Sequence, residues 1–244
     1  MFVVEGATVL AAAVAAGAEV ETVFVAGADP LAAAVSEAVE AAAAGGARVY
    51  RLAPGVLERV ADTVSPQPVL AVVRTPHRGL EVLDGATFVV VCVAVRDPGN
   101  AGTVIRSADA AGADAVVCCG TSVDPFNPKT VRSSAGSVLH VPVVADADVD
   151  EVLGALDARH IGTWAAVAHG GRPYTEIDWR RPGALLLGNE AAGLPATVAA
   201  SARGAVSIPL AGRAESLNVS MAASVLCFEV LRQRSNLHAV EPCP

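Results

Sequence analysis

Residues 88–112 read FVVVCVAVRDPGNAGTVIRSADAAG, and this stretch decides the fold. It opens with an apolar run, Phe88–Val95, that is rich in β-branched residues and leads into an Asp-Pro-Gly turn. Such a run predicts a strand buried on both faces, as in the centre of a parallel sheet. Residues 100–112 predict a helix, with Asn100 as its N-terminal cap and Gly112 at its end. A buried strand followed directly by a helix indicates an α/β fold.

The same alternation continues toward the C-terminus. Its predicted strands are 115–119, 163–168, 184–187 and 205–209, and its predicted helices are 132–136, 145–157 and 219–234. This order predicts a parallel sheet with crossover helices. Because ligands of open α/β sheets bind at the carboxyl ends of strands, the loops that follow these strands are candidate sites.

The first 75 residues predict a smaller α/β unit. Its predicted helices are 7–16, 31–44 and 54–61, and its predicted strands are 20–26, 48–52 and 69–73, with a short strand or turn at residues 3–6. A polar break that begins at Arg74 and extends to Asp84-Gly85 is typical of a linker. We therefore predict an N-terminal domain at 1–76, a linker at 77–86 and a second domain at 87–244.

Composition limits the classes of function. Hydrophobic residues make up 53% of the 244, yet no apolar run approaches the roughly 20 residues of a membrane span. The sequence shows no signal-peptide pattern, so we expect a soluble, cytoplasmic protein with no membrane partner. The five cysteines lack C-x-x-C spacing and lie mostly in apolar runs, which predicts reduced core residues and no metal site. Because the net charge is −8, any RNA contact has to come from locally clustered arginines.

Three strands of the second domain run into loops rich in Gly, Asn, Ser and Glu, at 98–106, 188–195 and 208–220. Glycines allow close approach of the backbone to a ligand, and loops held by a rigid sheet commonly carry sites. None is a known phosphate loop, because G-x-G-x-x-G and G-x-x-x-x-G-K-[ST] are both absent from the sequence. One such loop would be an ordinary connection, but three at strand ends favour a binding site.

These loops resemble, in order, the three motifs of the SpoU (TrmH) family of RNA 2′-O-ribose methyltransferases, in the SPOUT superfamily. NAGTVIR at 100–106 resembles motif 1, LGNEAAGL at 187–194 resembles motif 2, and IPL at 208–210 with ESLNVSMA at 215–222 resembles motif 3. The N-terminal unit, which starts FVVEG at 2–6, is similar to the ribosomal-protein-L30e-like substrate-binding domain of many members. The resemblance implies a trefoil knot at the carboxyl end of the catalytic domain, a rare exception to unknotted topology.

The resemblance also implies the cofactor. S-adenosylmethionine would be held by the knot largely through backbone groups, and a ribose 2′-hydroxyl would attack its methyl group. The implied cofactor-binding residues lie in motifs 2 and 3: Leu187, Gly188, Asn189, Ile208, Pro209, Leu210 and Leu217. An alcohol is hardly ionised at neutral pH, so the enzyme must position the hydroxyl and help to remove its proton.

Among the implied catalytic residues, Arg106 is the central one. Its guanidinium suits an RNA phosphate beside the target ribose, and because it is hard to deprotonate we favour phosphate clamping over a role as general base. Asn100 and Glu190 would orient Arg106 and the substrate, while Ser216 and Asn218 would hold the arginine and the ribose. The residues alone allow other roles: Asn100, Ser216 and Asn218 as helix caps, and Glu190 as a surface acid.

The partners follow from the same resemblance. An RNA-facing cluster would use Arg106, Lys129, Arg132 and Arg213, with solvated surface charge as the alternative. Family members act as homodimers, and the apolar stripe of the last helix suits either a dimer interface or the intramolecular core: Val219, Ala222, Ala223, Leu226 and Val230.

The sequence therefore predicts an S-adenosylmethionine-dependent RNA 2′-O-methyltransferase. Ribosomal RNA, and 23S rRNA in particular, is favoured over tRNA, because an L30e-like domain suits structured rRNA loops. The alternatives are a tRNA methyltransferase, a non-catalytic RNA-binding or ribosome-assembly protein on the same fold, and an enzyme that methylates a small molecule.

Overall fold

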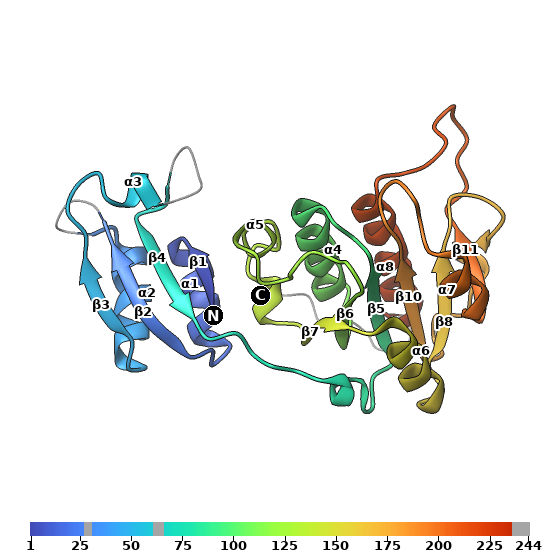
Figure 1. Cartoon of the computed structure of the whole chain (residues 1–244), viewed down its shortest axis with the longest axis horizontal. Helices are drawn as coiled ribbons and strands as arrows, with labels where there is room; N and C mark the ends of the chain where they lie inside the picture. The colour runs from blue at the N-terminus through green and yellow to red at the C-terminus, as the bar shows by residue number, and fades with distance from the viewer. Residues whose placement is uncertain (27–30, 61–65, 236–244) are drawn as a thin grey trace.

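A computed structural model describes residues 1–26, 31–60 and 66–235 (Figure 1). The strands form two sheets, one of four strands in the N-terminal part and one of seven in the C-terminal part. Residues 74–79, which have no regular structure, and the short 3-10 helix η1 (Leu80–Leu83) connect the two. Within the described ranges, no helix is long and apolar enough to cross a membrane.

The seven-stranded sheet has the order β7-β6-β5-β10-β8-β11-β9, and every neighbouring pair is parallel. Its strands are β5 (Phe88–Val93), β6 (Ala115–Cys119), β7 (Val143–Ala147), β8 (Gly162–Ala166), β9 (Arg172–Pro173), β10 (Gly183–Leu187) and β11 (Gly204–Ser207). Alternate residues of β5 enter two separate apolar cores: Phe88 and Val90 one, Val89 and Val91 the other. The predicted central strand, buried on both faces, is therefore confirmed.

Helices cover both faces of this sheet. One core contains residues of α4 (Pro98–Ala110), α5 (Pro128–Ser133) and α8 (Val219–Ser235). The opposite core contains residues of η1, α6 (Val149–Ala158) and α7 (Ala196–Ser201). Two further 3-10 helices, η2 (Ser137–Leu139) and η3 (Tyr174–Glu176), lie in the connections. This is the three-layer α/β arrangement that the alternating pattern predicts.

Several predicted boundaries need correction. The helix predicted at 145–157 begins only at Val149, because Asp148 caps it and the preceding residues form β7, a strand that was not predicted. The helix predicted at 132–136 is α5, which ends at Ser133, since Ala135 and Gly136 both have positive φ. Helix α7 and the two-residue strand β9 were also missed. Acidic and short segments of this kind carry little apolar periodicity.

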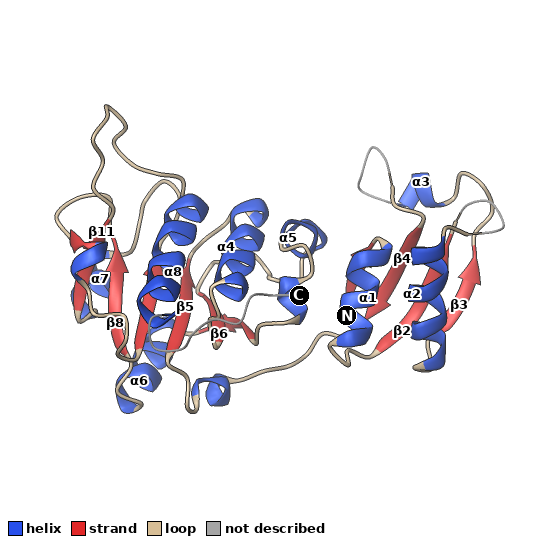
Figure 2. Cartoon of the chain, turned by 180° about the vertical axis from the view of Figure 1, so that it is seen from behind, coloured by secondary structure: helices blue, strands red, loops and turns tan. Residues whose placement is uncertain are grey.

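The N-terminal sheet has the order β1-β4-β2-β3 and mixes antiparallel with parallel pairs. Its strands are β1 (Phe2–Glu5), β2 (Val20–Val25), β3 (Arg48–Arg51) and β4 (Val69–Val73). The predicted strand or turn at 3–6 is therefore a strand as far as Glu5. Helices α1 (Ala7–Ala15) and α2 (Ala33–Ala44) cover one face (Figure 2), and the short α3 (Leu57–Val60) lies at one end of the sheet.

The N-terminal sheet packs beside α5 of the C-terminal part. The rings of Phe2 and Phe126 lie 5.1 Å apart, and Arg132 of α5 forms an ion pair with Glu5 at 3.6 Å. The N-terminal and C-terminal parts are therefore held together by side-chain contacts as well as by the connecting chain.

The cysteines of the described part are free and buried, as predicted: Cys92, Cys118, Cys119 and Cys227. Burial raises the pKa of Cys119 and of Cys227 to about 12, so both remain thiols at neutral pH. Cys243 lies outside the described residues.

Candidate active site

Three loops that are distant in sequence meet at the carboxyl ends of β5 and β10, and Asn100 joins them. The Asn100 side-chain amide donates to Oε1 of Glu190 at 3.2 Å, across 90 residues of sequence. Its Oδ1 accepts a hydrogen bond from Nδ2 of Asn218 at 3.0 Å, across 118 residues. One asparagine therefore uses its donor and its acceptor to connect the loops after β5 and β10 to the loop before α8.

Asn100 is free for this role because it does not cap α4, contrary to one sequence-based expectation. The helix begins at Pro98, and its cap is Asp97, whose carboxylate accepts from the Asn100 backbone N–H at 2.8 Å. Asn218 does cap α8, since its Oδ1 accepts from the N–H of Ser220 at 2.9 Å. Ser216 is exposed and precedes that cap, so it is not a helix cap.

Glu190 is an oriented carboxylate rather than a loose surface acid. Its oxygens accept hydrogen bonds from the backbone N–H groups of Arg96 at 3.3 Å and Asp97 at 3.1 Å. Partial burial favours the protonated form, but backbone N–H groups and the Asn100 amide outweigh it, and the pKa of Glu190 lies below its ordinary value. Glu190 is therefore ionised at neutral pH and acts as a hydrogen-bond acceptor.

The loop after β10 is tied to the end of β5 by Asn189. Its Nδ2 donates to the carbonyl of Ala94 at 3.0 Å, and its Oδ1 accepts from the N–H groups of Ala191 and Ala192, each at 3.0 Å. Ala94 has φ +56°, a left-handed conformation that is unfavourable for a residue with a Cβ. The surrounding hydrogen bonds hold this turn, as is common where loops form a site.

A cavity of about 330 Å³ lies beside this junction, between the ends of β8, β10 and β11 and helix α8. Six of the seven predicted cofactor residues line it, together with Glu190 and Ser216: Leu187, Gly188, Asn189, Ile208, Leu210 and Leu217. Pro209 is not among the lining residues. The sequence missed residues 166–168, which follow β8, because that segment carries none of the three motifs.

The cavity suits S-adenosylmethionine in size and in chemistry. Its volume lies within the usual range of small-molecule sites. Its walls are apolar side chains, among them Ile208, Leu210 and Leu226, which suit an adenine ring, and the backbone of 188–193 offers hydrogen-bonding groups. Within the described ranges, no group of three His, Cys, Asp or Glu side chains is placed to hold a metal ion.

Arg106 lies on α4, the helix that carries Asn100, and its side chain is exposed. In the described part of the chain it has no hydrogen-bond or ion-pair partner, so its guanidinium is available to a ligand. Lys129 and Arg213 are exposed as well. Arg132, the fourth residue of the predicted RNA-facing cluster, is paired with Glu5, a contact that the sequence did not predict.

We expect an Asn100→Asp substitution to impair the site in a pH-dependent manner. The new carboxylate would replace the amide that donates to Glu190 and would place two negative charges in contact. Because the two carboxylates repel each other, the pKa of one of them is raised. At lower pH the pair therefore binds one proton, which restores a hydrogen bond between residue 100 and Glu190.

The ratio of Asn100→Asp activity to wild-type activity should therefore rise as the pH falls from about 8 to about 5, from a deficit of about tenfold or more. Asn100→Ala, which introduces no charge, is the control and should show a constant ratio. A flat ratio for Asn100→Asp would contradict the contact with Glu190.

The sequence profile of the SpoU rRNA Methylase family matches residues 87–228, the range that contains the cavity and the three loops. The chain belongs to the SpoU rRNA methylase family. The profile of the MRM3-like substrate binding domain matches residues 1–71. The predicted family is thereby confirmed.

Characterised SpoU relatives cover most of the chain. It is 40% identical over 185 residues to the 23S rRNA (guanosine(2553)-2′-O)-methyltransferase RlmP of Bacillus subtilis. The aligned region covers 76% of this chain and 73% of the relative. It is 36% identical to a 23S rRNA (uridine(2479)-2′-O)-methyltransferase of Streptomyces viridochromogenes, over 75% of this chain and 67% of the relative.

Solved structures agree with these matches. The SpoU methyltransferase AviRb from Streptomyces viridochromogenes, in complex with the cofactor AdoMet, superimposes with a TM-score of 0.86 at 32% identity, covering 96% of this chain and 91% of that one. The AdoMet-bound rRNA methyltransferase from Sinorhizobium meliloti gives a TM-score of 0.84 at 32% identity, covering 95% and 87%. The predicted fold class, a parallel-sheet SPOUT domain after a small α/β domain, is confirmed. The trefoil knot stays a prediction.

Proposed function

We propose that this chain transfers the methyl group of S-adenosylmethionine to a ribose 2′-hydroxyl of 23S ribosomal RNA. The observation that carries the proposal is the junction of Asn100, Glu190 and Asn218 beside an apolar cavity of cofactor size. The enzyme class and the cofactor agree with family membership, with relatives named as 23S rRNA 2′-O-methyltransferases, and with neighbours crystallised with AdoMet.

The cavity binds and orients the cofactor. When bound, S-adenosylmethionine supplies the electrophilic methyl group. The apolar side chains around Ile208 and Leu226 would exclude water from the adenosine, and the backbone of 188–193 would provide polar contacts. Glu190 and Ser216 line the same cavity, so the Asn100 junction would lie beside a bound cofactor.

Arg106 fixes the RNA for the reaction. Its guanidinium holds a phosphate beside the target ribose in a two-point contact, which places the 2′-hydroxyl for in-line attack. A guanidinium stays protonated at neutral pH, so the hydroxyl proton passes to that phosphate or to water rather than to Arg106. Asn218, held by Asn100, and Ser216 contact the ribose.

The remaining RNA contacts come from outside the cavity. Lys129 and Arg213 are exposed and supply local positive charge on an acidic chain. The functional units are an N-terminal substrate domain at 1–76, a linker at 77–86 and a catalytic domain at 87–244, in line with the two profile matches. We also propose a cytoplasmic location, in keeping with a ribosomal substrate.

A homodimer through α8 belongs to the same proposal, but on a different face from the one suggested by the sequence. The stripe that includes Ala223, Leu226 and Val230 is buried within the chain. Met221, Val225 and Phe228 form a second stripe on α8 and are 59%, 38% and 49% exposed. An exposed apolar stripe on one helix is typical of an interface.

We therefore expect Phe228→Arg to weaken the dimer by about 30-fold or more, since buried aromatic anchors commonly dominate interfaces. Sedimentation analysis at several concentrations measures this. Asp157→Arg, which places the same side chain on the exposed face of α6, is the control. A folded Phe228→Arg variant that associates like the wild type would rule out this face.

Methyl transfer to separate pools of unmodified 23S rRNA and tRNA tests the function. We expect 23S rRNA to carry the labelled methyl groups and, after alkaline hydrolysis, to release them in dinucleotides. The reason is that a 2′-O-methyl group blocks cleavage of the adjacent phosphodiester. Label in tRNA alone would show that the substrate is tRNA and not 23S rRNA. Turnover without RNA would indicate a small-molecule methyltransferase. A protein that binds the cofactor and labels neither pool would be a non-catalytic RNA binder.

A further inference from the structure

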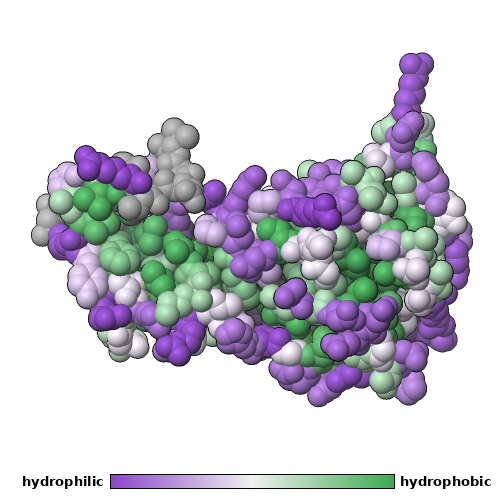
Figure 3. All heavy atoms as spheres, viewed as in Figure 1, coloured by the Kyte–Doolittle hydropathy of each residue, from purple (hydrophilic) through white to green (hydrophobic). Residues whose placement is uncertain are grey.

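In the described part of the chain, one face of the N-terminal sheet carries no layer of helices like the one on its other face. Alternate residues such as Val4, Val23 and Ala71 are buried beneath α1 and α2. Because side chains alternate along a strand, Val3, Phe24 and Leu70 point the other way, and these are only half buried. Figure 3, in which this face is turned to the viewer, shows apolar surface across the N-terminal part of the chain.

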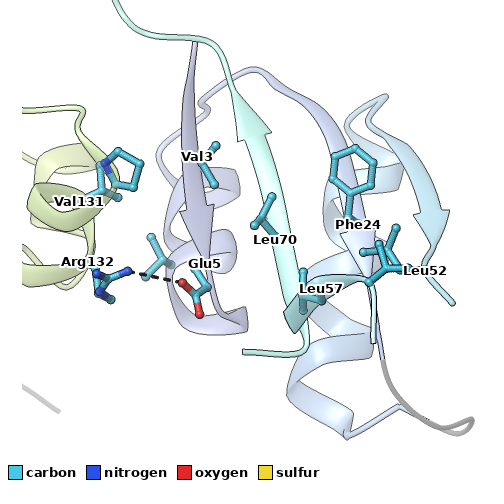
Figure 4. A pocket seen from close by; sticks show the side chains of 11 residues that line it. Val3, Glu5, Phe24, Leu52, Leu57, Leu70, Val131 and Arg132 are labelled. Atoms are coloured by element: carbon cyan, nitrogen blue, oxygen red, sulfur yellow. Dashed lines mark ion pairs between the residues drawn. The ribbon is translucent and has the colours of Figure 1, made fainter. Parts of the chain in front are cut away.

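This open face forms a cavity of about 460 Å³ with helix α5 of the catalytic part. The sheet side contributes Val3, Phe24 and Leu70, with Leu57 of α3 at one end, and α5 contributes Val131 (Figure 4). Among the described residues that line it, only Glu5 and Arg132 are charged, and they form the ion pair across the gap. Most of its walls are therefore apolar, and a single guanidinium lies at its edge.

The aromatic content of this face is concentrated beside the edge strand. The rings of Phe24 and Tyr50 are 5.8 Å apart and inclined by only 23°, a stacked pair, and Tyr50 is 49% exposed. The register places Phe24 opposite Tyr50 and Thr22 opposite Arg48, so Arg48 lies on the same face as the two rings. The chain has few aromatic residues, only 4% of the total, and two of them are stacked here.

We propose that this cavity binds an unpaired nucleobase of the RNA substrate, stacked on the Phe24 and Tyr50 pair, with its flanking phosphates at Arg48 and Arg132. The inference rests on the proposed function, since it assumes that RNA is the substrate. The apolar lining, which includes Phe24, suits the face of a base, and Tyr50 lies beside it, stacked on Phe24. Arg132 in the lining and Arg48 on the neighbouring strand β3 suit the adjoining phosphates. A second copy of this chain is a poorer occupant, because strand β3 carries arginine at both ends and would face its own like charge.

The position of the cavity agrees with this assignment. Its outer wall is α5, which packs against α4, and α4 carries Arg106. The close packing depends on Gly102, where a Cβ would come within 2.8 Å of the Ser134 backbone nitrogen. A base held in the cavity would therefore be anchored at a set distance from the ribose that Arg106 positions. Such a contact would select the RNA and would not take part in the reaction.

The test compares two exposed neighbours on β3 whose side chains point to opposite faces. The full-length Tyr50→Ala and Val49→Ala variants are measured for binding to one RNA oligonucleotide of 23S sequence, first single-stranded and then annealed to its complement. We expect Tyr50→Ala to weaken single-strand binding by between about fivefold and 150-fold and to leave duplex binding unchanged. Val49→Ala should change neither, and Tyr50→Phe, which keeps the ring, should bind like the wild type. Equal effects of Tyr50→Ala and Val49→Ala, or equal losses on single strand and duplex, would overturn the proposal.

Two further measurements keep the outcome unambiguous. Phe24→Leu keeps the apolar volume and removes the ring, so it should also weaken single-strand binding if stacking is the cause, even where Tyr50→Ala misfolds. In methyl transfer to 23S rRNA, Tyr50→Ala should raise KM with little change in kcat. If the wild-type protein methylates 23S rRNA and neither the Tyr50→Ala nor the Phe24→Leu variant changes RNA binding, the base site alone is overturned. If these variants lose single-strand binding but the wild-type protein methylates no RNA, the proposed function alone is overturned. A change of self-association in Tyr50→Ala would assign the face to a second copy instead.

Discussion

Replacement of Arg106 by alanine should reduce methyl transfer by about 10²- to 10³-fold, the usual cost of removing one group that stabilises charge in a site. S-adenosylmethionine affinity should be nearly unchanged, because Arg106 does not line the cavity beside β10 and α8. Stability should also be nearly unchanged, since the side chain is exposed and has no ion-pair partner in the described part of the chain. Single-turnover methyl transfer and calorimetric cofactor binding measure the two effects separately.

Two variants serve as controls for this result. Arg106→Lys keeps the charge but loses the planar fork, so it should recover only part of the activity. Arg181→Ala removes an arginine that is 73% exposed and distant in sequence from the three loops, and it should be neutral. If Arg106→Ala loses cofactor affinity in proportion to activity, then Arg106 supports the cofactor site and does not act on the RNA.

Substitution of Gly188 by alanine should reduce the affinity for S-adenosylmethionine until binding is no longer detected. A Cβ at this position would clash with the Gly193 backbone carbonyl carbon and the Leu194 nitrogen, and would lie 2.6 Å from the Gly193 oxygen. Backbone atoms cannot rotate away as a side chain can, so the loop that lines the cavity must shift. Overpacking of this kind typically costs about 1–3 kcal/mol, and a displaced loop loses the hydrogen bonds between Asn189 and Gly193 as well.

The matched control is Gly154→Ala. Gly154 lies within α6, and a Cβ there would meet nothing within 4 Å. Alanine at an exposed helix position should therefore raise the free energy of unfolding by about 0.5–1 kcal/mol and leave cofactor affinity unchanged. Calorimetric titration with S-adenosylmethionine and thermal unfolding of both variants test the pair. A Gly188→Ala protein with wild-type affinity would show that the loop after β10 does not form the cofactor site.

Much of the catalytic domain could be predicted because its signals are local. The run at Phe88–Val93 is apolar at every position, which only a strand buried on both faces requires, and the sheet places β5 between two cores. Gly112 ends α4 with φ +73°, as a glycine after a helix predicts. Where the local signal was weak the prediction failed, as in β7, whose last three residues, Ala145–Ala147, were assigned to the following helix.

The candidate site, too, was predicted in part and missed in part. Motif order pointed to Asn100, Glu190 and Asn218, which hydrogen bonds connect, and to six residues that line the cavity. The role of Arg106 stays a prediction. The cap of α4 was assigned wrongly, because Asp97 and Asn100 are both good capping residues and sequence does not show which begins the helix. Residues 166–168 were missed because they reach the cavity only through the position of β8 beside β10 in the sheet.

By itself, the sequence determined the class of fold, the strand at its centre, the three loops at strand ends and the family to which they belong. Only the tertiary structure decided that Asn100 connects Glu190 and Asn218, that Arg132 pairs with Glu5, and that one face of the N-terminal sheet stays open toward α5. The reason is physical: hydrophobic period, capping and turn residues act over a few positions and can be read along the chain. Contacts across 90 or 118 residues depend instead on strand order and helix packing, which bring the loops to one edge of the sheet.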